Sequence, residues 1–380
     1  MIAKIFLLIV AAGFGYFLLA GQSMNKTAMR IRNMPAVKDV NRSQADDYPE
    51  TSIVAEGLDT PWSLVFLPDD SILVAERPGR VRFIGADGKM DTKPITLKQV
   101  AEVGEGGLLG MTLHPNFASN RFIYFYYTYH ETKGNTLNRV VRMKYENRQL
   151  TDEKIIIDNI PGQSNHNGGR IKFGPDKNLY ITTGDAQQPE LSQDKTSLNG
   201  KILRVTDEGK KPVGNPFDNL VYSFGHRNSQ GLVWDENGEL YATEHGRSGI
   251  MSGLDEFNRI EPGKNYGWPV IEGDETRDGM STPQLNSGPS ETWAPAGLAF
   301  YKGAFYFGGL RGSALYQVVF TGGKPRIAEY FKNEFGRIRD VEIGPDNMLY
   351  ITTSNKDGRG TLRTGDDKII RINPEKLRIW

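Results

Sequence analysis

The sequence returns six times to one unit, in which an apolar strand, a tight turn and a second strand rich in aromatic residues follow one another. Two copies have nearly the same turn, RIKFGPDKNLYITTG at 170–184 and RDVEIGPDNMLYITTSN at 339–355. The other copies lie at 62–76, 110–128, 231–246 and 297–309. Internal repeats with a period of roughly 40 to 50 residues, or somewhat longer, are typical of propeller blades.

A strand pair of this kind cannot bury both of its faces alone, so radial stacking of the pairs is the economical arrangement. No stretch between the pairs has the long apolar stripe of an amphipathic helix. We therefore predict an all-β fold, a single six-bladed β-propeller, with a closing strand from 366–373 that pairs near the first blade. A β-sandwich of the same hairpins is the alternative, and the regular return of the turn counts against it.

The N-terminal segment differs from this body. Residues 1–21 contain one early lysine and then an apolar run from Ile5 to Gly21, which is short for a membrane span of roughly 20 residues. We expect a secretory signal peptide, or alternatively an uncleaved N-terminal anchor, and either predicts a periplasmic or secreted body. Residues 22–50 are polar and are expected to be a linker, which leaves 51–380 as the propeller and catalytic domain.

The overall charge limits the class of ligand. The 46 basic and 46 acidic side chains balance, which argues against a nucleic-acid binder. An anionic ligand would therefore have to be met by a local cluster of cations. There is no cysteine, so no disulfide and no lipid attachment at cysteine is expected.

Segments that lead into the blades, here called lead-ins, depart from the repeat and are the expected place of function. In a propeller, connections at one rim converge on the central channel. The lead-ins are VGEGGLLG at 103–110, SNHNGGR at 164–170, SFGHRNSQGL at 223–232, GGLRGSAL at 308–315 and FGRIRD at 335–340. They carry the polar candidates Glu105, Asn165, His166, Arg227, Asn228, Arg311, Arg337 and Arg339.

Two chemical properties follow from these residue types. Planar guanidinium groups bind carboxylates or phosphates through two parallel hydrogen bonds, so four arginines in converging lead-ins predict a pocket for a small polyanion. His166 is suited to take the proton of an alcohol, because histidine is the side-chain type that commonly serves as a general base. A lone histidine is otherwise commonly a structural hydrogen-bonding group. His226 has a weaker case as a base, and we expect its ring to point elsewhere.

The lead-ins resemble those of the soluble PQQ-dependent glucose/aldose sugar dehydrogenases, where PQQ is pyrroloquinoline quinone. The similar strings spread over residues 52–373, and GHRNSQGL together with NYGWP is the most specific pair. The strings are GEGGLLGMTLHPNF, HNGGRIKFGPDKNLYITTGD, GKILRV, YSFGHRNSQGL, DEFNRIEPGKNYGWP and GRIRDV. The fold of that family is a six-bladed propeller, in agreement with the repeat count.

The resemblance implies a role for each lead-in residue. His166 would be the general base that takes the proton of the sugar C1 hydroxyl, while hydride passes to PQQ and the product is the lactone. Arg227 would polarise the quinone carbonyl, where a fixed positive charge strongly stabilises the negative charge that develops in the reaction. Asn228 would contact the quinone beside it. Arg311, Arg337 and Arg339 would clamp the carboxylates of the cofactor. Glu105 would lie near the cofactor, and Asn165 would lie near the sugar.

The resemblance also implies calcium, which prefers oxygen ligands in flexible geometry. One ion would lie at the cofactor site on the backbone carbonyls of Gly246 and Arg247. A second, structural ion would use Glu256 and the backbone or side chain of Tyr266. Asp255 and Glu256 could instead be exposed loop acids.

Departures from the family pattern fall mostly around the substrate. Position 311 is arginine where the best-known sugar oxidiser has lysine, residue 165 is asparagine instead of aspartate, and the loop 247–254 differs. The expected partners are an aldose substrate and an electron acceptor. The acceptor is expected to be external, because the chain has no haem-attachment motif. The alternatives are a calcium-dependent lactonase, which would need more acids in the channel, and a non-catalytic propeller that binds carbohydrate or protein through Trp268 and Trp293.

Overall fold

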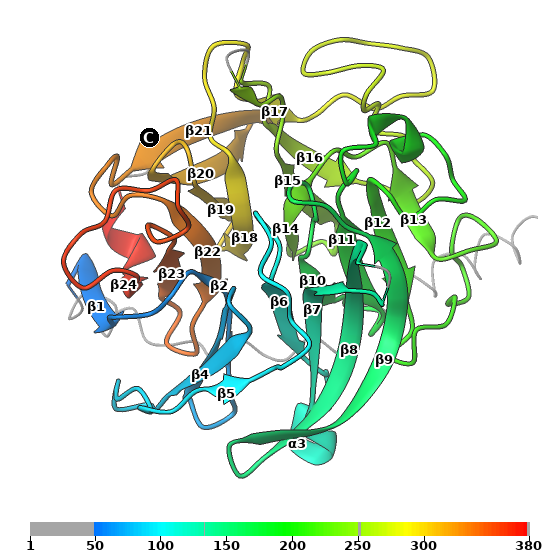
Figure 1. Cartoon of the computed structure of the whole chain (residues 1–380). Helices are drawn as coiled ribbons and strands as arrows, with labels where there is room; N and C mark the ends of the chain where they lie inside the picture. The colour runs from blue at the N-terminus through cyan, green and yellow to red at the C-terminus, as the bar shows by residue number, and fades with distance from the viewer. Residues whose placement is uncertain (1–48, 133, 250–251, 378–380) are drawn as a thin grey trace, which may run out of the picture. The chain divides into compact units, whose positions relative to one another are not determined.

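Six four-stranded antiparallel sheets form the propeller in the computed structural model, which describes residues 49–132, 134–249 and 252–377 (Figure 1). The inner strands of neighbouring sheets contact one another around the centre, in the order β2, β6, β10, β14, β18 and β22. The predicted six-bladed, all-β fold is therefore confirmed. The expectations for residues 1–21 and for 22–48 lie outside the described residues.

The strand bounds of the first three blades show that each repeat supplies the inner half of one sheet. Blade one contains β2 (Pro61–Phe66), β3 (Ile72–Glu76), β4 (Arg80–Ile84) and β5 (Ile95–Thr96). Blade two contains β6 (Leu108–Leu113), β7 (Phe122–His130), β8 (Thr136–Glu146) and β9 (Gln149–Pro161). Blade three contains β10 (Ile171–Phe173), β11 (Leu179–Thr183), β12 (Lys201–Val205) and β13 (Val221–Phe224).

The other three blades follow the same plan. Blade four contains β14 (Ser229–Trp234), β15 (Leu240–Glu244), β16 (Glu256–Ile260) and β17 (Leu285–Asn286). Blade five contains β18 (Pro295–Tyr301), β19 (Ala304–Gly309), β20 (Ala314–Thr321) and β21 (Lys324–Tyr330). Blade six contains β22 (Ile338–Ile343), β23 (Leu349–Thr353), β24 (Ile369–Ile372) and β1 (Thr51–Ala55).

Helical segments are short throughout the described part of the chain. They are α3 (Phe117–Asn120) and the 3₁₀ turns η1 (Pro189–Ser192) and η3 (Pro374–Lys376). In the residues that the structure describes, no helix is long and apolar enough to cross a membrane.

The recurring turn has a local physical cause. In blade three the Asp176 carboxylate accepts the backbone N–H of Asn178 at 3.1 Å and the hydroxyl of Tyr180 at 3.1 Å. In blade six Asp346 accepts the hydroxyl of Tyr350 at 2.9 Å in the same way. The aspartate therefore closes the tight turn and ties it to the strand that follows, as aspartate commonly does in turns.

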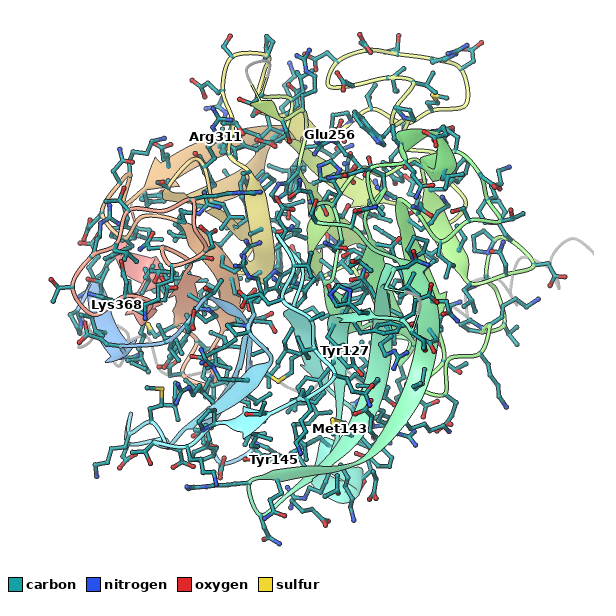
Figure 2. All side chains as sticks on the ribbon, viewed as in Figure 1. Tyr127, Met143, Tyr145, Glu256, Arg311 and Lys368 are labelled. Carbon is teal, nitrogen blue, oxygen red and sulfur yellow. The ribbon has the colours of Figure 1, made fainter. Side chains whose placement is uncertain are left out.

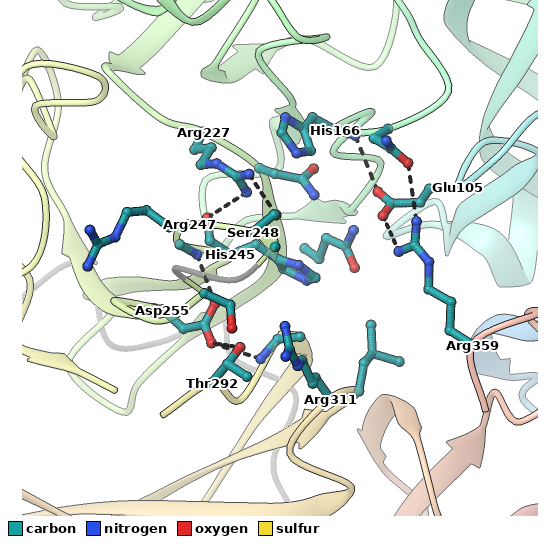
Figure 3. Close-up of a pocket in the computed structure, with 18 of the residues that line it drawn as sticks. Glu105, His166, Arg227, His245, Arg247, Ser248, Asp255, Thr292, Arg311 and Arg359 are labelled. Atoms are coloured by element: carbon teal, nitrogen blue, oxygen red, sulfur yellow. Dashed lines mark hydrogen bonds and ion pairs between the residues drawn. The ribbon is translucent and has the colours of Figure 1, made fainter. Parts of the chain in front are cut away.

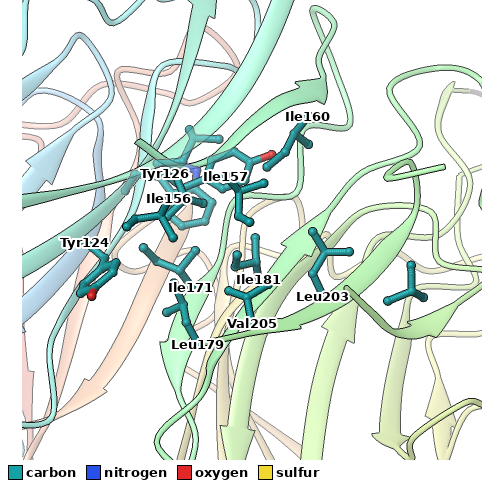
Figure 4. Packing of buried hydrophobic residues seen from close by; sticks show 14 of the residues in the cluster. Tyr124, Tyr126, Ile156, Ile157, Ile160, Ile171, Leu179, Ile181, Leu203 and Val205 are labelled. Carbon is teal, nitrogen blue, oxygen red and sulfur yellow. The ribbon is translucent and has the colours of Figure 1, made fainter. Parts of the chain in front are cut away.

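The blades are held together by apolar side chains that interdigitate between adjacent sheets. Between blades two and three, Tyr126, Ile157, Ile171 and Ile181 are buried in one cluster (Figure 4). Burial of each such side chain contributes about 1.5–3 kcal/mol. In Figure 2, Tyr145 of blade two lies toward the end of the molecule opposite Arg311.

Closure of the ring differs from the prediction. The predicted closing residues contribute β24, which is the third strand of blade six and pairs with β23. The strand that completes this blade is β1, which joins β24 with Thr51 opposite Ile372 and Ile53 opposite Ile370. The N-terminal strand of the propeller is therefore the outermost strand of its last blade.

Candidate functional site

A cavity of about 520 Å³ lies at one rim, where loops from all parts of the ring converge (Figure 3). It contains ten of the twelve residues proposed from the sequence. These are Glu105, Asn165, His166, Arg227, Asn228, Gly246, Arg247, Arg311, Arg337 and Arg339. Glu256 and Tyr266 lie outside it. The cavity is within the range of ligand pockets, about 300–1,000 Å³.

His166 is oriented by a carboxylate that the sequence reasoning did not single out. Its Nδ1 lies 2.8 Å from Asp185, which is 1% exposed and also accepts the ring N–H of Trp268 at 2.9 Å. An ionised carboxylate only accepts, so Nδ1 carries the proton and Nε2 of the neutral ring keeps its lone pair. His166 has φ +60°, and a side chain at Gly184 would collide with its carbonyl oxygen at 1.8 Å. The backbone is thus shaped to hold this ring.

Asp185 had a detectable sequence signature. The two nearly identical repeats end differently, with LYITTGD in blade three and LYITTSN in blade six. The acid stands at the position where the copies diverge. Comparison of the repeats with each other would therefore have found it.

Glu105 lies beside His166 and is held as a carboxylate. It accepts the backbone N–H of His166 at 3.3 Å, and it forms an ion pair with Arg359 at 2.5 Å. Burial by itself raises the pKa of Glu105. In acid, where His245 is protonated, the charges of His245 and Arg359 outweigh burial and lower the pKa of Glu105 to about 2. Arg359 also donates to the side chain of Asn165 at 3.3 Å. The loop that carries Arg359 therefore extends from blade six to the mouth of the cavity. No local sequence pattern indicates the contact of Arg359 with Glu105.

The six arginines of the cavity divide into two groups. Three of them form ion pairs with carboxylates, Arg247 with Glu272 at 3.4 Å, Arg337 with Asp357 at 2.8 Å and Arg359 with Glu105. For Arg227, Arg311 and Arg339, no carboxylate of the described residues lies within ion-pair distance. The cavity therefore presents three positive charges that no described carboxylate neutralises.

Arg227 is placed by a buried network. Its backbone N–H donates to Glu244, whose carboxylate also lies 2.8 Å from Nδ1 of His226. Its guanidinium donates to the Ser248 hydroxyl at 2.9 Å and to the backbone oxygen of His245 at 3.4 Å. Burial lowers the pKa of Arg227, although the charge of Asp185 opposes this. The side chain stays a cation with donors directed at the cavity.

His226 turns away from the cavity, as expected. Its Nε2 lies 2.8 Å from the Ser223 hydroxyl, and its ring stacks on Tyr266 with centroids 4.7 Å apart. Both the ring and Ser223 are fully buried. His226 is therefore a packed structural group.

Five buried polar atoms of cavity-lining residues have no hydrogen-bond partner in the described part of the chain. They are Nε of Arg227, Nδ2 of Asn228, Nε2 of His245, Nε of Arg247 and Nε of Arg339. Buried polar groups are nearly always paired in folded proteins, so a cluster of unpaired groups indicates that a polar ligand completes it. Burial lowers the pKa of His245 to about 4, so that its imidazole is neutral at neutral pH. The sequence reasoning had missed His245.

Burial also lowers the pKa of Arg339 to about 9, even though Asp357 opposes the shift. Its Nη1 donates to the side-chain oxygen of Gln230 at 2.5 Å. A low effective dielectric strengthens its attraction for any anion that enters.

The residues proposed for calcium lie in two places. At the cavity, the Gly246 N–H donates to Asp255 at 2.8 Å, and the Arg247 carbonyl accepts the N–H of Gly253 at 3.4 Å. Among the described residues, no group of three or more histidine, aspartate or glutamate side chains is arranged to hold a metal ion. A cofactor-site ion would therefore depend on backbone oxygens, as the resemblance implies.

Glu256 begins β16 beside Glu244 and Glu272, around a void of about 10 Å³. Burial and then the charge of Glu244 raise the pKa of Glu256 to about 8. The hydroxyl of Tyr266 is engaged elsewhere, because it donates to the Arg259 carbonyl at 2.6 Å. Only the backbone oxygen of Tyr266 remains as a ligand.

The alternative that Asp255 and Glu256 are exposed loop acids is wrong. Asp255 is 2% exposed, and its Oδ2 accepts backbone N–H groups of Trp293 and Ala294 at 2.6 and 2.9 Å. It fixes the loop that borders the cavity on the side of blade five (Figure 3).

Comparison with known proteins agrees with this geometry. The family model described as Glucose / Sorbosone dehydrogenase matches residues 58–369. The chain belongs to this family. The predicted resemblance is therefore confirmed, and the family points to PQQ-dependent sugar dehydrogenase activity.

Three relatives illustrate the similarity. Aldose sugar dehydrogenase YliI of Escherichia coli (strain K12) is 32% identical over 339 residues, 80% of this chain and 90% of the relative. Quinoprotein glucose dehydrogenase B of Acinetobacter calcoaceticus is 30% identical over 302 residues, 66% of this chain and 62% of the relative. The PQQ-bound form of aldose sugar dehydrogenase from Streptomyces coelicolor superposes with a TM-score of 0.78 at 39% identity, covering 84% and 97% of the two chains.

Proposed function

We propose that this family member oxidises aldose sugars at C1 to the lactone, with PQQ as its cofactor. The observation that carries the proposal is the set of three unneutralised arginines, Arg227, Arg311 and Arg339, beside a histidine oriented by a buried aspartate. PQQ has three carboxylates, so three guanidinium groups match its charge. The unpaired donors of Asn228 and Arg339 offer it further hydrogen bonds.

The chain's own residues supply the acid–base chemistry. When bound, PQQ supplies an electrophilic quinone that accepts hydride from the sugar carbon. Nε2 of His166 takes the proton of the C1 hydroxyl, and Asp185 stabilises the imidazolium that results. The guanidinium of Arg227 provides a fixed positive charge next to the reacting groups, where developing negative charge is stabilised most. Asn165 lines the cavity next to His166 and would contact the sugar.

Calcium, localisation and electron transfer are part of the same proposal. One Ca²⁺ would bind the backbone carbonyls of Gly246 and Arg247 at the cavity, and a second would bind Glu256 and the backbone carbonyl of Tyr266. The body is proposed to be periplasmic or secreted, and an external acceptor would take up the electrons.

The two other readings have less support. A calcium-dependent lactonase would need carboxylates that converge on a metal, whereas the cavity contains six arginines. A carbohydrate-binding propeller would need exposed aromatic surfaces. Trp293 is 5% exposed and Trp268 donates its ring N–H to Asp185, so neither forms an open platform.

Reconstitution tests the proposal. The full chain, purified without cofactor, is supplied with PQQ and Ca²⁺, and dye reduction is followed with a panel of aldoses. We expect turnover that requires PQQ, and we expect H166A to lose about 10²- to 10⁴-fold in kcat while it still binds PQQ. Turnover of H166A within about tenfold of wild type would show that His166 is not the general base. A folded wild-type protein that does not bind PQQ would refute the function.

A further inference from the structure

Lys201, at the start of β12, is a buried cation for which the proposed chemistry has no use. Its side chain is fully buried, and its Nζ donates to the backbone carbonyls of Leu191 and Ser192, each at 3.0 Å, and of Asn199. No carboxylate of the described residues lies within ion-pair distance of it. A buried ammonium is costly without such partners. Three converging carbonyl oxygens surround it much as they would surround a bound monovalent cation.

The three carbonyls all belong to the segment that runs from the end of β11 to the start of β12. This segment, 185–200, has only the short turn η1 as regular structure, and its own backbone hydrogen bonds are those of successive tight turns, such as the Gln188 N–H to the Asp185 carbonyl at 2.9 Å. It is nonetheless packed closely. A Cβ at Gly200 would lie 2.1 Å from the Ser192 hydroxyl and 2.2 Å from the His226 carbonyl.

The same segment supports the orientation of His166. The side-chain amide of Asn199 donates to the Asp185 carbonyl at 2.8 Å, and the Ser192 hydroxyl donates to the His226 carbonyl at 2.8 Å. The Asp185 carboxylate in turn holds Nδ1 of His166 at 2.8 Å. One residue, Asn199, therefore connects the lysine to the carboxylate that orients the ring.

We propose that Lys201 is a positioning residue of this enzyme, whose ammonium anchors the segment 185–200 and thereby holds Asp185 in register with His166. This inference rests on the proposed function, because it assigns Lys201 an effect on turnover through His166. It predicts that the contacts of Arg311 and Arg339 with the cofactor are independent of Lys201, since these two arginines belong to other blades. Arg227 meets the segment through its backbone carbonyl, which accepts the Asp185 N–H at 2.8 Å, whereas its guanidinium is held by Ser248 and His245.

The chain offers a matched control in the same blade. Lys172 on β10 is partly buried and pairs with Glu342 at 2.8 Å, away from the segment 185–200. K172M therefore removes the same kind of group, with the same replacement, and leaves the carbonyls around Lys201 untouched. K201R keeps a cation with several donors, whereas K201M removes every donor.

The experiment compares wild type, K201M, K201R and K172M in the full chain. Hydrogen exchange of the apoprotein measures how well residues 185–200 are held, PQQ titration measures cofactor affinity, and steady-state dye reduction separates kcat from KM. We expect K201M to speed exchange in 185–200 and to lower kcat by about 10- to 100-fold, the size of effect that a small misplacement of a catalytic group produces. PQQ affinity and KM should stay close to wild type, and K201R should recover part of the loss.

The outcomes separate the two proposals. Equal loss of kcat in K201M and K172M, or faster exchange without any loss of kcat, would overturn the role of Lys201. If wild type shows no PQQ-dependent turnover, the proposed function fails. In that case the exchange data still decide whether Lys201 anchors the segment, and unchanged exchange in K201M refutes it.

Discussion

At the scale of single residues, the site depends on pairing between groups that no local pattern connects. His166 precedes β10 and Asp185 follows β11, and the hairpin of these two strands brings Nδ1 of His166 to 2.8 Å from the Asp185 carboxylate. The carboxylate keeps the Nδ1 proton in place, which leaves Nε2 free to act on the substrate.

Replacing this carboxylate by its amide tests the orientation directly. D185N keeps the shape of the side chain but can present its N–H₂ to Nδ1, which favours the other ring tautomer. We expect kcat to fall by about 10²- to 10⁴-fold with PQQ affinity unchanged, measured by dye reduction and by PQQ titration. An activity equal to wild type would show that Asp185 does not control the ring.

Substitution of Arg311 tests whether the arginines without a carboxylate partner bind the anionic cofactor. R311M removes a charge that no described carboxylate pairs with, so the loss should appear in ligand affinity and not in folding. A charge-assisted hydrogen bond is worth about 1.5–3 kcal/mol, which corresponds to a fall in PQQ affinity of roughly 10- to 150-fold. R326M, on the exposed outer strand β21 of the same blade, is the control and should bind PQQ like wild type. Equal affinities in all three proteins would contradict a role for Arg311.

At the scale of elements, the outer strand β1 and the segment 185–200 are both held in place by contacts with residues that are distant along the chain. The five residues of β1 close the last blade by pairing with β24, far away in the sequence. Without β1, the edge of β24 would expose its backbone groups to solvent.

Truncation tests this closure. A chain that begins at residue 57 lacks β1, whereas a chain that begins at residue 49 keeps it. We expect the longer deletion to lower Tm by about 1.5–3 °C relative to the shorter one, as loss of one or two kcal/mol does in a domain of this size. Circular dichroism melts measure the difference, and equal melting temperatures would show that β1 does not close the blade.

At the scale of the whole molecule, calcium is the remaining prediction that links the cavity to stability. Glu256 lies beside two other glutamates at the start of β16, a repulsion that a divalent cation would relieve. Addition of Ca²⁺ after treatment with a chelator should raise Tm in wild type and raise it less in E256Q. E236Q, an exposed acid of the same blade, is the control. An equal rise in Tm in wild type and E256Q would show that Glu256 is not a ligand of the metal.

Most of the architecture could be predicted from the sequence because it depends on neighbours along the chain. Alternation of apolar residues and the aspartate-closed turns act over a few residues, and they determine six hairpins wherever the chain goes. The departures from the repeat, such as SNHNGGR and SFGHRNSQGL, marked eight residues that do line one cavity, and the family resemblance added Gly246 and Arg247.

What only the tertiary structure decided is which of these groups are paired. Arg337 is neutralised by Asp357 while Arg311 and Arg339 are not, and Arg359 reaches Glu105 across 254 positions of sequence. The closing strand, the orienting Asp185 and the buried Lys201 depend in the same way on distant contacts. The sequence by itself therefore determined the blades and the location of the site, because these follow from local patterns. Charge balance and orientation inside the site were decided by folding, because electrostatic pairing depends on distance in space and not on separation along the chain.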